Sequence, residues 1–225
     1  CGIFATSRDI ADLDNLTEFL WRRGPDATNH LDYRGISFVH TLLSMTGKLT
    51  LQPFIDGEKD LVALFNGEIY NYLDFGNYDS DGQCILPLYE EHGVDFLPML
   101  DGEYAIAVFD FSKDIMILST DIFSTKPLWF AVENGEFALG SYATSLTRHG
   151  FENATQMPAN TTRIYSISRL NLIEDRTVWD FDLQQHKTTF DDWNKAFENA
   201  IYKRTNGIKH GIFIGLSSGY DSGAI

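Results

Sequence analysis

Cys1-Gly2-Ile3-Phe4-Ala5-Thr6 opens the chain, and this short apolar run, typical of a buried strand, begins with a cysteine. No methionine precedes Cys1, which indicates that processing exposes this residue. A terminal cysteine carries a nucleophilic thiol and an α-amine, whose reference pKa of ~8 allows it to accept the thiol proton. A cloning boundary or a cleaved signal-peptide junction would also place a cysteine here, so the downstream residues must decide.

The composition restricts the classes of partner. The 225 residues contain 32 acidic and 17 basic side chains, for a formal charge of −15. Such a surface repels phosphate backbones and anionic lipid, which argues against nucleic acid and membrane partners. No apolar run approaches the ~20 residues of a membrane span, and we expect a cytoplasmic protein. The two cysteines, Cys1 and Cys84, are too few for a structural zinc site, and no metal site is predicted.

The apolar pattern predicts a domain of mixed strands and helices over residues 1–180. Helices are expected at 9–21, from Ser80 to about 92, and at 141–148. Pro87 weakens the prediction of one unbroken helix after Ser80. Strands are expected at 1–6, 35–43, 61–65, 103–109, 114–119, 127–132, 136–139, 161–168 and 171–179.

The character of the sequence changes after residue 180. Residues 181–188 are acidic and polar and indicate a linker. An amphipathic helix is expected at 190–204, and a fully apolar strand at 211–216. The strand leads into Ser217-Ser218-Gly219-Tyr220-Asp221-Ser222-Gly223. Residues 189–225 therefore read as the incomplete start of a second, α/β domain.

Three motifs have both a chemical and a structural interpretation. Asn66-Gly67 can form an oxyanion hole from a side-chain amide and a backbone N–H, or a simple hairpin turn. Ser80-Asp81 can cap a helix, or supply a carboxylate for a substrate ammonium group. The loop from Ser217 can cradle a pyrophosphate group on backbone N–H groups, or be a generic Ser/Gly turn.

Taken in order, these motifs resemble the class II glutamine amidotransferases of the N-terminal-nucleophile hydrolase superfamily, and most closely those of the asparagine synthetase type. The resemblance covers the whole chain. The segments that carry it are Cys1-Gly2-Ile3-Phe4, Arg23-Gly24-Pro25-Asp26, His40-Thr41-Leu42-Leu43-Ser44, Gln52-Pro53, Asn66-Gly67-Glu68-Ile69-Tyr70-Asn71, Ser80-Asp81, Asp101-Gly102-Glu103-Tyr104-Ala105, Asp121, Lys126-Pro127-Leu128 and the loop from Ser217.

The resemblance implies an α+β, four-layer αββα sandwich followed by the truncated start of an α/β PP-loop domain of the adenine nucleotide α-hydrolase type. It also implies a role for each matching residue. Cys1 would attack the glutamine side-chain amide, Asn66 and Gly67 would hold the oxyanion, and the thioester would then be hydrolysed. Glu68, Asp81, Thr46 and Arg23 would bind the substrate. Ser217, Ser218, Gly219, Asp221 and Ser222 would bind ATP, with Mg²⁺, in the synthetase domain.

The partners implied are glutamine, the remainder of a synthetase domain in cis or in trans, and a second copy in a homodimer. The amidotransferase domain itself would need no cofactor. The ammonia acceptor cannot be assigned from the sequence.

Several positions depart from the family pattern. Leu42 stands where the family carries an arginine for the glutamine α-carboxylate, and Arg34, Lys48 or Arg23 could compensate. Thr120, Ser124, Tyr142 and Ser218 also differ from the family residues. Three hypotheses follow: a glutamine amidotransferase that feeds an ATP-dependent amide-forming domain, an N-terminal-nucleophile amidohydrolase acting on another amide, and a degenerate, non-catalytic domain.

Overall fold

The computed structural model describes residues 1–206, 208 and 211–224. Its backbone contacts divide the chain into two compact units, Cys1–Asp180 and Phe181–Ile225. Each unit is described by itself.

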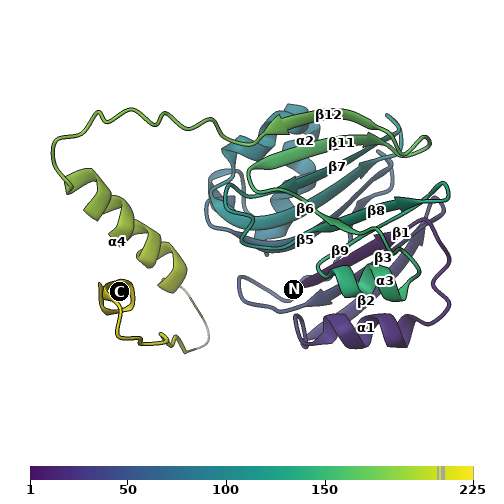
Figure 1. The fold of residues 1–225 in the computed structure, drawn as a ribbon, viewed down its shortest axis with the longest axis horizontal. Helices are drawn as coiled ribbons and strands as arrows, with labels where there is room; N and C mark the ends of the chain where they lie inside the picture. The colour runs from purple at the N-terminus through teal and green to yellow at the C-terminus, as the bar shows by residue number, and fades with distance from the viewer. Residues whose placement is uncertain (207, 209–210, 225) are drawn as a thin grey trace. The chain divides into compact units, whose positions relative to one another are not determined.

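Within the described residues, the strands of the first unit form two antiparallel six-stranded sheets (Figure 1). The first sheet has the order β10-β8-β9-β1-β3-β2, with bounds Thr155–Gln156, Trp129–Glu133, Glu136–Gly140, Gly2–Thr6, Ile36–Leu42 and Ala27–Tyr33. The second has the order β12-β11-β7-β6-β5-β4, with bounds Leu172–Thr177, Thr161–Ser166, Ile115–Thr120, Gly102–Asp110, Leu61–Ile69 and Phe54–Asp56.

Helices cover the outer face of each sheet. Helices α1 (Leu13–Trp21) and α3 (Ala143–Arg148) pack on the first sheet, and α2 (Ile85–His92) packs on the second. Short 3₁₀ turns precede and follow α2, at η1 (Tyr72–Asp74), η2 (Asp81–Cys84) and η3 (Gly93–Met99).

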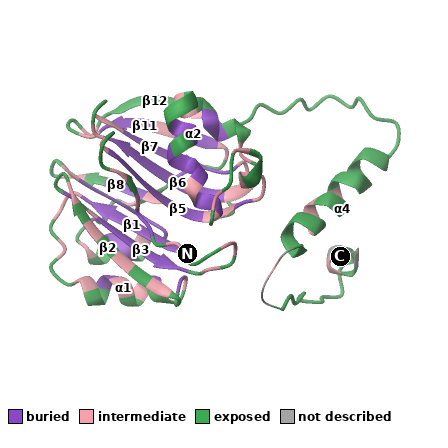
Figure 2. Ribbon diagram, turned by 180° about the vertical axis from the view of Figure 1, so that it is seen from behind, coloured by how far each residue is buried: buried purple, intermediate pink, exposed green. Residues whose placement is uncertain are grey.

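Three buried clusters correspond to the three interfaces of this stack. One joins the facing surfaces of the two sheets, and each of the others joins a sheet to its helices. The buried strands form the continuous interior in Figure 2. The unit is therefore the αββα sandwich expected from the sequence.

Strand β5 shows how the sequence builds two of these interfaces at once. Successive side chains of a strand point to opposite faces of its sheet. Leu61, Ala63 and Phe65 pack toward α2, while Val62 and Leu64 pack between the sheets. The same alternation directs Asn66 and Glu68 into the space between the sheets, at the end where β5 finishes.

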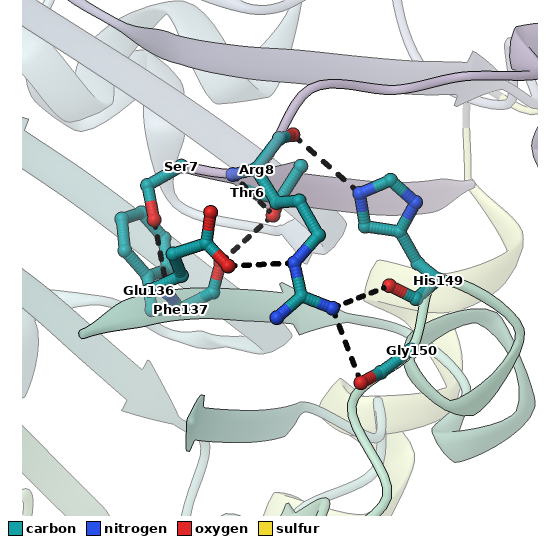
Figure 3. Close-up of polar contacts among 7 residues, drawn as sticks. All are labelled: Thr6, Ser7, Arg8, Glu136, Phe137, His149 and Gly150. Carbon is teal, nitrogen blue, oxygen red and sulfur yellow. Dashed lines mark hydrogen bonds and ion pairs between the residues drawn. The ribbon is translucent and has the colours of Figure 1, made fainter. Parts of the chain in front are cut away.

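Arg8 holds the C-terminal end of β1 in place through hydrogen bonds. Its Nε donates to Glu136 Oε2 at 2.7 Å, and its Nη1 donates to the carbonyl oxygens of His149 and Gly150, both at 3.1 Å (Figure 3). Two further hydrogen bonds join this end of β1 to Phe137. Thr6 Oγ1 donates to Phe137 O, and Phe137 N donates to Ser7 Oγ. The strand that begins next to Cys1 is thus held to β9 and to the end of α3.

Most of the expected elements are present, with some shifted boundaries. Helix α1 begins at Leu13 rather than at residue 9, because the Asp12 carboxylate accepts from Asn15 N at 2.9 Å and caps it there. The helix expected after Ser80 starts as the 3₁₀ turn η2, with Ser80 and Gln83 in a capping box. Pro87 lies in the first turn of α2, where its missing N–H costs no helical hydrogen bond.

The second unit contains α4 (Asp191–Thr205) and the short α5 (Tyr220–Ala224). Helix α4 agrees with the expected 190–204, and it buries none of its side chains. The strand expected at 211–216 is wrong for this chain, because these residues are exposed and have no strand structure. An apolar strand needs a neighbouring strand for its backbone hydrogen bonds, and no such neighbour lies among the described residues of this unit. Among the helices of the described segments, none is long and apolar enough to cross a membrane.

Candidate active site

Cys1 lies at the start of β1, at one end of the space between the two sheets (Figures 1 and 2). Its Sγ is 3.4 Å from Leu43 N, which donates to it, and 3.6 Å from Leu43 O. Arg23 Nε donates to the carbonyl oxygen of Cys1 at 2.8 Å. The thiol is thus held by contacts with the backbone of Leu43, and Cys1 is only partly buried.

Asn66 meets Cys1 from the opposite sheet. In the amide orientation that satisfies its neighbours, Asn66 Nδ2 donates to Cys1 O at 2.9 Å, and its oxygen accepts from Arg23 Nη2 at 3.3 Å. Arg23 and Asn66 therefore bind the same carbonyl group and each other. The side chain of Asn66 therefore contacts the backbone of Cys1, and the two predicted catalytic residues meet across the sandwich.

The α-amine of Cys1 is suited to accept a proton. Burial lowers the pKa of this amine to about 5, and the positive charges of Arg23 and Lys126 act in the same direction. Glu68 and Asp26 oppose the shift without reversing it. At neutral pH the amine is uncharged and can take the proton from the thiol on the same residue.

Asn66-Gly67 is not a hairpin turn. Both residues lie inside β5, opposite Ala105 and Tyr104 of β6. A Cβ on Gly67 would stand 2.0 Å from Glu103 O, so this strand position requires glycine for the close approach of β6. The turn interpretation of this motif is therefore wrong.

The backbone N–H of Gly67 points out of the sheet edge. Alternate residues of β5 direct their N–H groups to opposite sides. Phe65 N donates to Gln52 Oε1 at 2.7 Å and Ile69 N donates to Asp81 Oδ2 at 2.9 Å, both on the β4 side. Gly67 lies between them and faces the same way, beyond the end of β4. Among the described residues, no side chain accepts a hydrogen bond from this N–H, as an oxyanion donor requires.

Carboxylates gather beside these donors. Glu68 lies opposite Glu103 across β5 and β6, and the Thr46 hydroxyl donates to Glu68 Oε2. Burial raises the pKa of Glu68. Asp81 is buried, and burial together with the charge of Glu68 raises its pKa to about 7. Three of the predicted substrate-binding residues, Glu68, Thr46 and Asp81, are thus brought to one region.

The fourth predicted binding residue, Arg23, faces the protein. It contacts Cys1 and Asn66, and its guanidinium carbon lies 5.0 Å from the Tyr142 ring centroid. The other two candidates for replacing the missing arginine are also paired: Arg34 Nη2 is 2.6 Å from Asp60 Oδ2, and Lys48 Nζ is 2.8 Å from Asp79 Oδ1.

Sequence reasoning assigned no role to Lys126 or to His40. Lys126 Nζ is 3.5 Å from Glu103 Oε2, and its charge acts on both the Cys1 amine and Glu68. His40 is completely buried in β3, opposite Ile3 of β1, and neither ring nitrogen has a hydrogen-bond partner among the described residues. Both residues belong to motifs named in the sequence analysis. Their spatial neighbours depend on how the strands pair, and the sequence alone does not give this pairing.

The predicted nucleotide loop lies in the second unit. Ser217 N donates to Ser222 Oγ at 3.1 Å, and Gly219 N donates to Ser217 Oγ at 3.1 Å. Ser218 is exposed between them, and the side chain of Asp221 lies outside the described residues. The role of this loop stays a prediction. In the described part of the chain, no group of three or more His, Cys, Asp or Glu residues is placed to hold a metal ion.

Known proteins are similar to this chain in sequence and in fold. The profile of the glutamine amidotransferase domain matches residues 1–180. The glutamine-hydrolysing asparagine synthetase B of Escherichia coli is 26% identical over an alignment that covers 100% of this chain and 43% of that protein. Amidase chyE of Penicillium rubens is 28% identical over 66% of this chain and 24% of its own length. This chain therefore spans less than half of either relative.

A solved structure, the glutamine phosphoribosylpyrophosphate amidotransferase of Bacillus subtilis, superposes with a TM-score of 0.61 over 80% of this chain and 50% of that one, at 14% identity. This likeness supports the assignment of the fold. Two facing antiparallel sheets between helices are the fold class that this chain shares with that structure. Within that class, the chain belongs to the glutamine amidotransferase domain family, and residues 1–180 are that enzymatic domain.

Proposed function

We propose that residues 1–180 hydrolyse glutamine to glutamate and ammonia through a thioester on Cys1. One observation supports this proposal: the uncharged α-amine and the thiol of Cys1 lie at the same end of the sandwich as the Asn66 and Gly67 donors.

The first half of the reaction forms the thioester. The α-amine accepts the thiol proton, and the sulfur attacks the side-chain carbonyl carbon of glutamine. The carbonyl electron pair moves to oxygen, where the Gly67 N–H and the Asn66 amide are placed to donate. The Asn66 amide nitrogen carries two N–H groups, so one can donate to the oxyanion while the other donates to the Cys1 carbonyl. The C–N bond then breaks, and the ammonium proton of the amine passes to the leaving nitrogen, which departs as ammonia.

The second half restores the enzyme. A water molecule attacks the thioester, and the α-amine accepts one of its protons. The C–S bond breaks, glutamate leaves and the thiol regains its proton. The sum is one water consumed, with one glutamate and one ammonia released. Glu68, Asp81 and Thr46 would hold the α-ammonium end of glutamine throughout.

The fate of the ammonia is also a proposal. We propose that the complete cytoplasmic protein passes it to an ATP- and Mg²⁺-dependent amide-forming domain, in cis or in trans and within a homodimer. The whole-chain match to an asparagine synthetase supports this. The nucleotide role of the loop from Ser217 to Ser222 stays a prediction, ATP chemistry is not expected in this fragment alone, and no step is assigned to the loop.

The test is glutamate release by protein whose first residue is Cys1. We expect turnover in the unaltered protein and its complete loss in Cys1→Ala. Cys84→Ala, which alters the buried second cysteine, serves as the control and should retain activity. No turnover by correctly processed protein, even with its complete partner domain, would contradict the proposal and favour the degenerate alternative.

A further inference from the structure

We propose that this site selects its substrate by the α-ammonium group and does not require a free α-carboxylate, so that amides with a neutral α-carboxyl end, such as glutaminamide, are substrates alongside glutamine. This inference rests on the proposed function, because it takes Cys1 as the nucleophile.

The wall beside the thiol is apolar. Gly2 pairs with Thr41 in the antiparallel register of β1 and β3, so Cys1 stands opposite Leu42. Directly opposite residues of antiparallel strands share one face of the sheet. Ile3 and Phe38 show that this face looks between the sheets. Leu42, only 7% exposed, is therefore the cross-strand neighbour of Cys1 on this face of the sheet. A substrate carboxylate placed against it would lose water without gaining a hydrogen bond.

The polar groups of the opposite sheet are mainly acidic. Glu68 and Glu103 face each other across β5 and β6, and Asp81 lies within electrostatic reach of Glu68. Lys126 is the basic group beside them, and it pairs with Glu103. Like charges raise one another's energy where burial limits their contact with water, and a bound substrate ammonium group would relieve this.

The positive groups near the thiol are already directed at protein acceptors. Arg23 holds the Cys1 carbonyl and the Asn66 amide, and its guanidinium lies over Tyr142. A substrate carboxylate could bind Arg23 only by competing with the contacts that hold the nucleophile and the oxyanion side chain in place. An ammonium group bound beside Glu68, Glu103 and Asp81 avoids this competition.

The decisive experiment compares three amides on the unaltered protein: glutamine, glutaminamide, and 4-carbamoylbutanoate, which keeps the carboxylate and lacks the amine. Chromatography with mass detection distinguishes isoglutamine, the product of side-chain hydrolysis of glutaminamide, from glutamate and glutarate. We expect kcat/KM for glutaminamide to lie within about tenfold of that for glutamine. We expect 4-carbamoylbutanoate to be lower by about tenfold or more, as for a lost charge-assisted contact.

Glutaminamide turned over more than about tenfold less efficiently than glutamine would overturn this inference and leave the proposed function intact. Failure with all three amides would contradict the proposed function and the inference together. Equal turnover of 4-carbamoylbutanoate and glutamine would also overturn the inference, because the ammonium group would then carry no selection.

A variant tests the same point from the protein side. Leu42→Arg should raise kcat/KM for glutamine relative to glutaminamide by about tenfold, because it supplies the missing cation beside Cys1. Leu49→Arg adds the same charge on a side chain that is 59% exposed and should leave the ratio unchanged. A ratio that stays constant in folded Leu42→Arg would contradict the inference, and if that variant does not fold, the three-amide comparison still decides.

Discussion

At the scale of single residues, the environment of Cys1 matters more than its identity. A partly buried thiol becomes a useful nucleophile because the amine on the same residue is buried and neutral. The contacts of Arg23 and Asn66 with the Cys1 carbonyl fix the backbone of this residue. Cys1 thus supplies the nucleophile and the base, and its backbone holds them in position. Small changes at the amino terminus should therefore have large effects on activity.

Blocking the amine tests this point. Adding one alanine before Cys1 replaces the amine with an amide, which cannot accept a proton. We expect glutamine turnover to fall by about 10²-fold or more, the usual contribution of a positioned base. Circular dichroism should show an unchanged fold. Turnover within about threefold of the unextended protein would show that the amine is not the base.

Asp81 gives a prediction in pH. Its pKa of about 7 means that its carboxyl group is ionised, and able to bind an ammonium group, only above that pH. We expect kcat/KM for glutamine to fall as the pH drops below 7. In Asp81→Asn, kcat/KM should be lower by about tenfold at pH 8, and the remaining acid limb should move toward 5, the pKa of the Cys1 amine. An unchanged profile in the variant would remove Asp81 from substrate binding.

His40 gives a prediction in stability. Burial holds the pKa of its ring at about 3, whereas the unfolded chain takes up this proton near pH ~6.5. The unfolded state therefore gains protons that the folded state does not, and stability is lost as the pH falls from 6.5 toward 3. Relative to His40→Phe, the unaltered protein should lose about 2–3 kcal/mol of unfolding free energy between pH 7 and pH 4.5. Urea unfolding at both pH values measures this, and parallel losses in the two proteins would contradict it.

At the scale of elements, β5 joins the core to the site. Its first residues pack on both faces, its last ones supply Asn66, Gly67 and Glu68, and its edge N–H groups bind Gln52 and Asp81. The strand can do this because glycine at position 67 lets β6 approach closely.

Gly67→Ala should break this arrangement. The added Cβ would overlap Glu103 O, so β5 and β6 must separate, at a cost of about 3 kcal/mol or more in unfolding free energy. Gly57→Ala is the matched control, because its Cβ would meet nothing within 4 Å. Equal stability of the two variants in denaturant unfolding would show that the strand tolerates a side chain at position 67.

In the first unit, the sequence predicted the strands with strong apolar patterns and missed a strand without one. Strands β5, β6 and β7 are nearly continuous apolar runs, whereas β2 alternates half-buried and exposed residues of mixed polarity and was not expected. The residues of the candidate site were likewise predicted only where a sequence motif marks them. Cys1, Asn66, Glu68 and Asp81 were found through motifs, and the structure brings them together. The pairing of Leu42 with Cys1 and the inward contacts of Arg23 depend on strand register, which one sequence does not display.

At the scale of the whole molecule, the three buried clusters lie entirely within the first 178 residues. Helix α4 buries none of its side chains, although Trp193 and Phe197 stack with ring centroids 5.2 Å apart. The first unit therefore holds the whole buried core of the part of the chain that the structure describes.

Removing residues 181–225 should leave the first unit folded. We expect protein 1–180 to unfold in one cooperative transition, with a free energy of unfolding within about 1 kcal/mol of that of the full chain. Guanidinium unfolding followed by tryptophan fluorescence and circular dichroism measures both quantities. A large loss of stability, or transitions that differ between the two probes, would show that the second unit contributes to the fold.

The most direct test of the central claim is the mass of the enzyme quenched in acid during glutamine turnover. The account predicts a glutamyl group bound as a thioester to Cys1, lost on mild alkaline treatment and absent from Cys1→Ala, with Cys84 unmodified. Glutamine turnover that persists in Cys1→Ala, or a glutamyl adduct on any other residue, would contradict it.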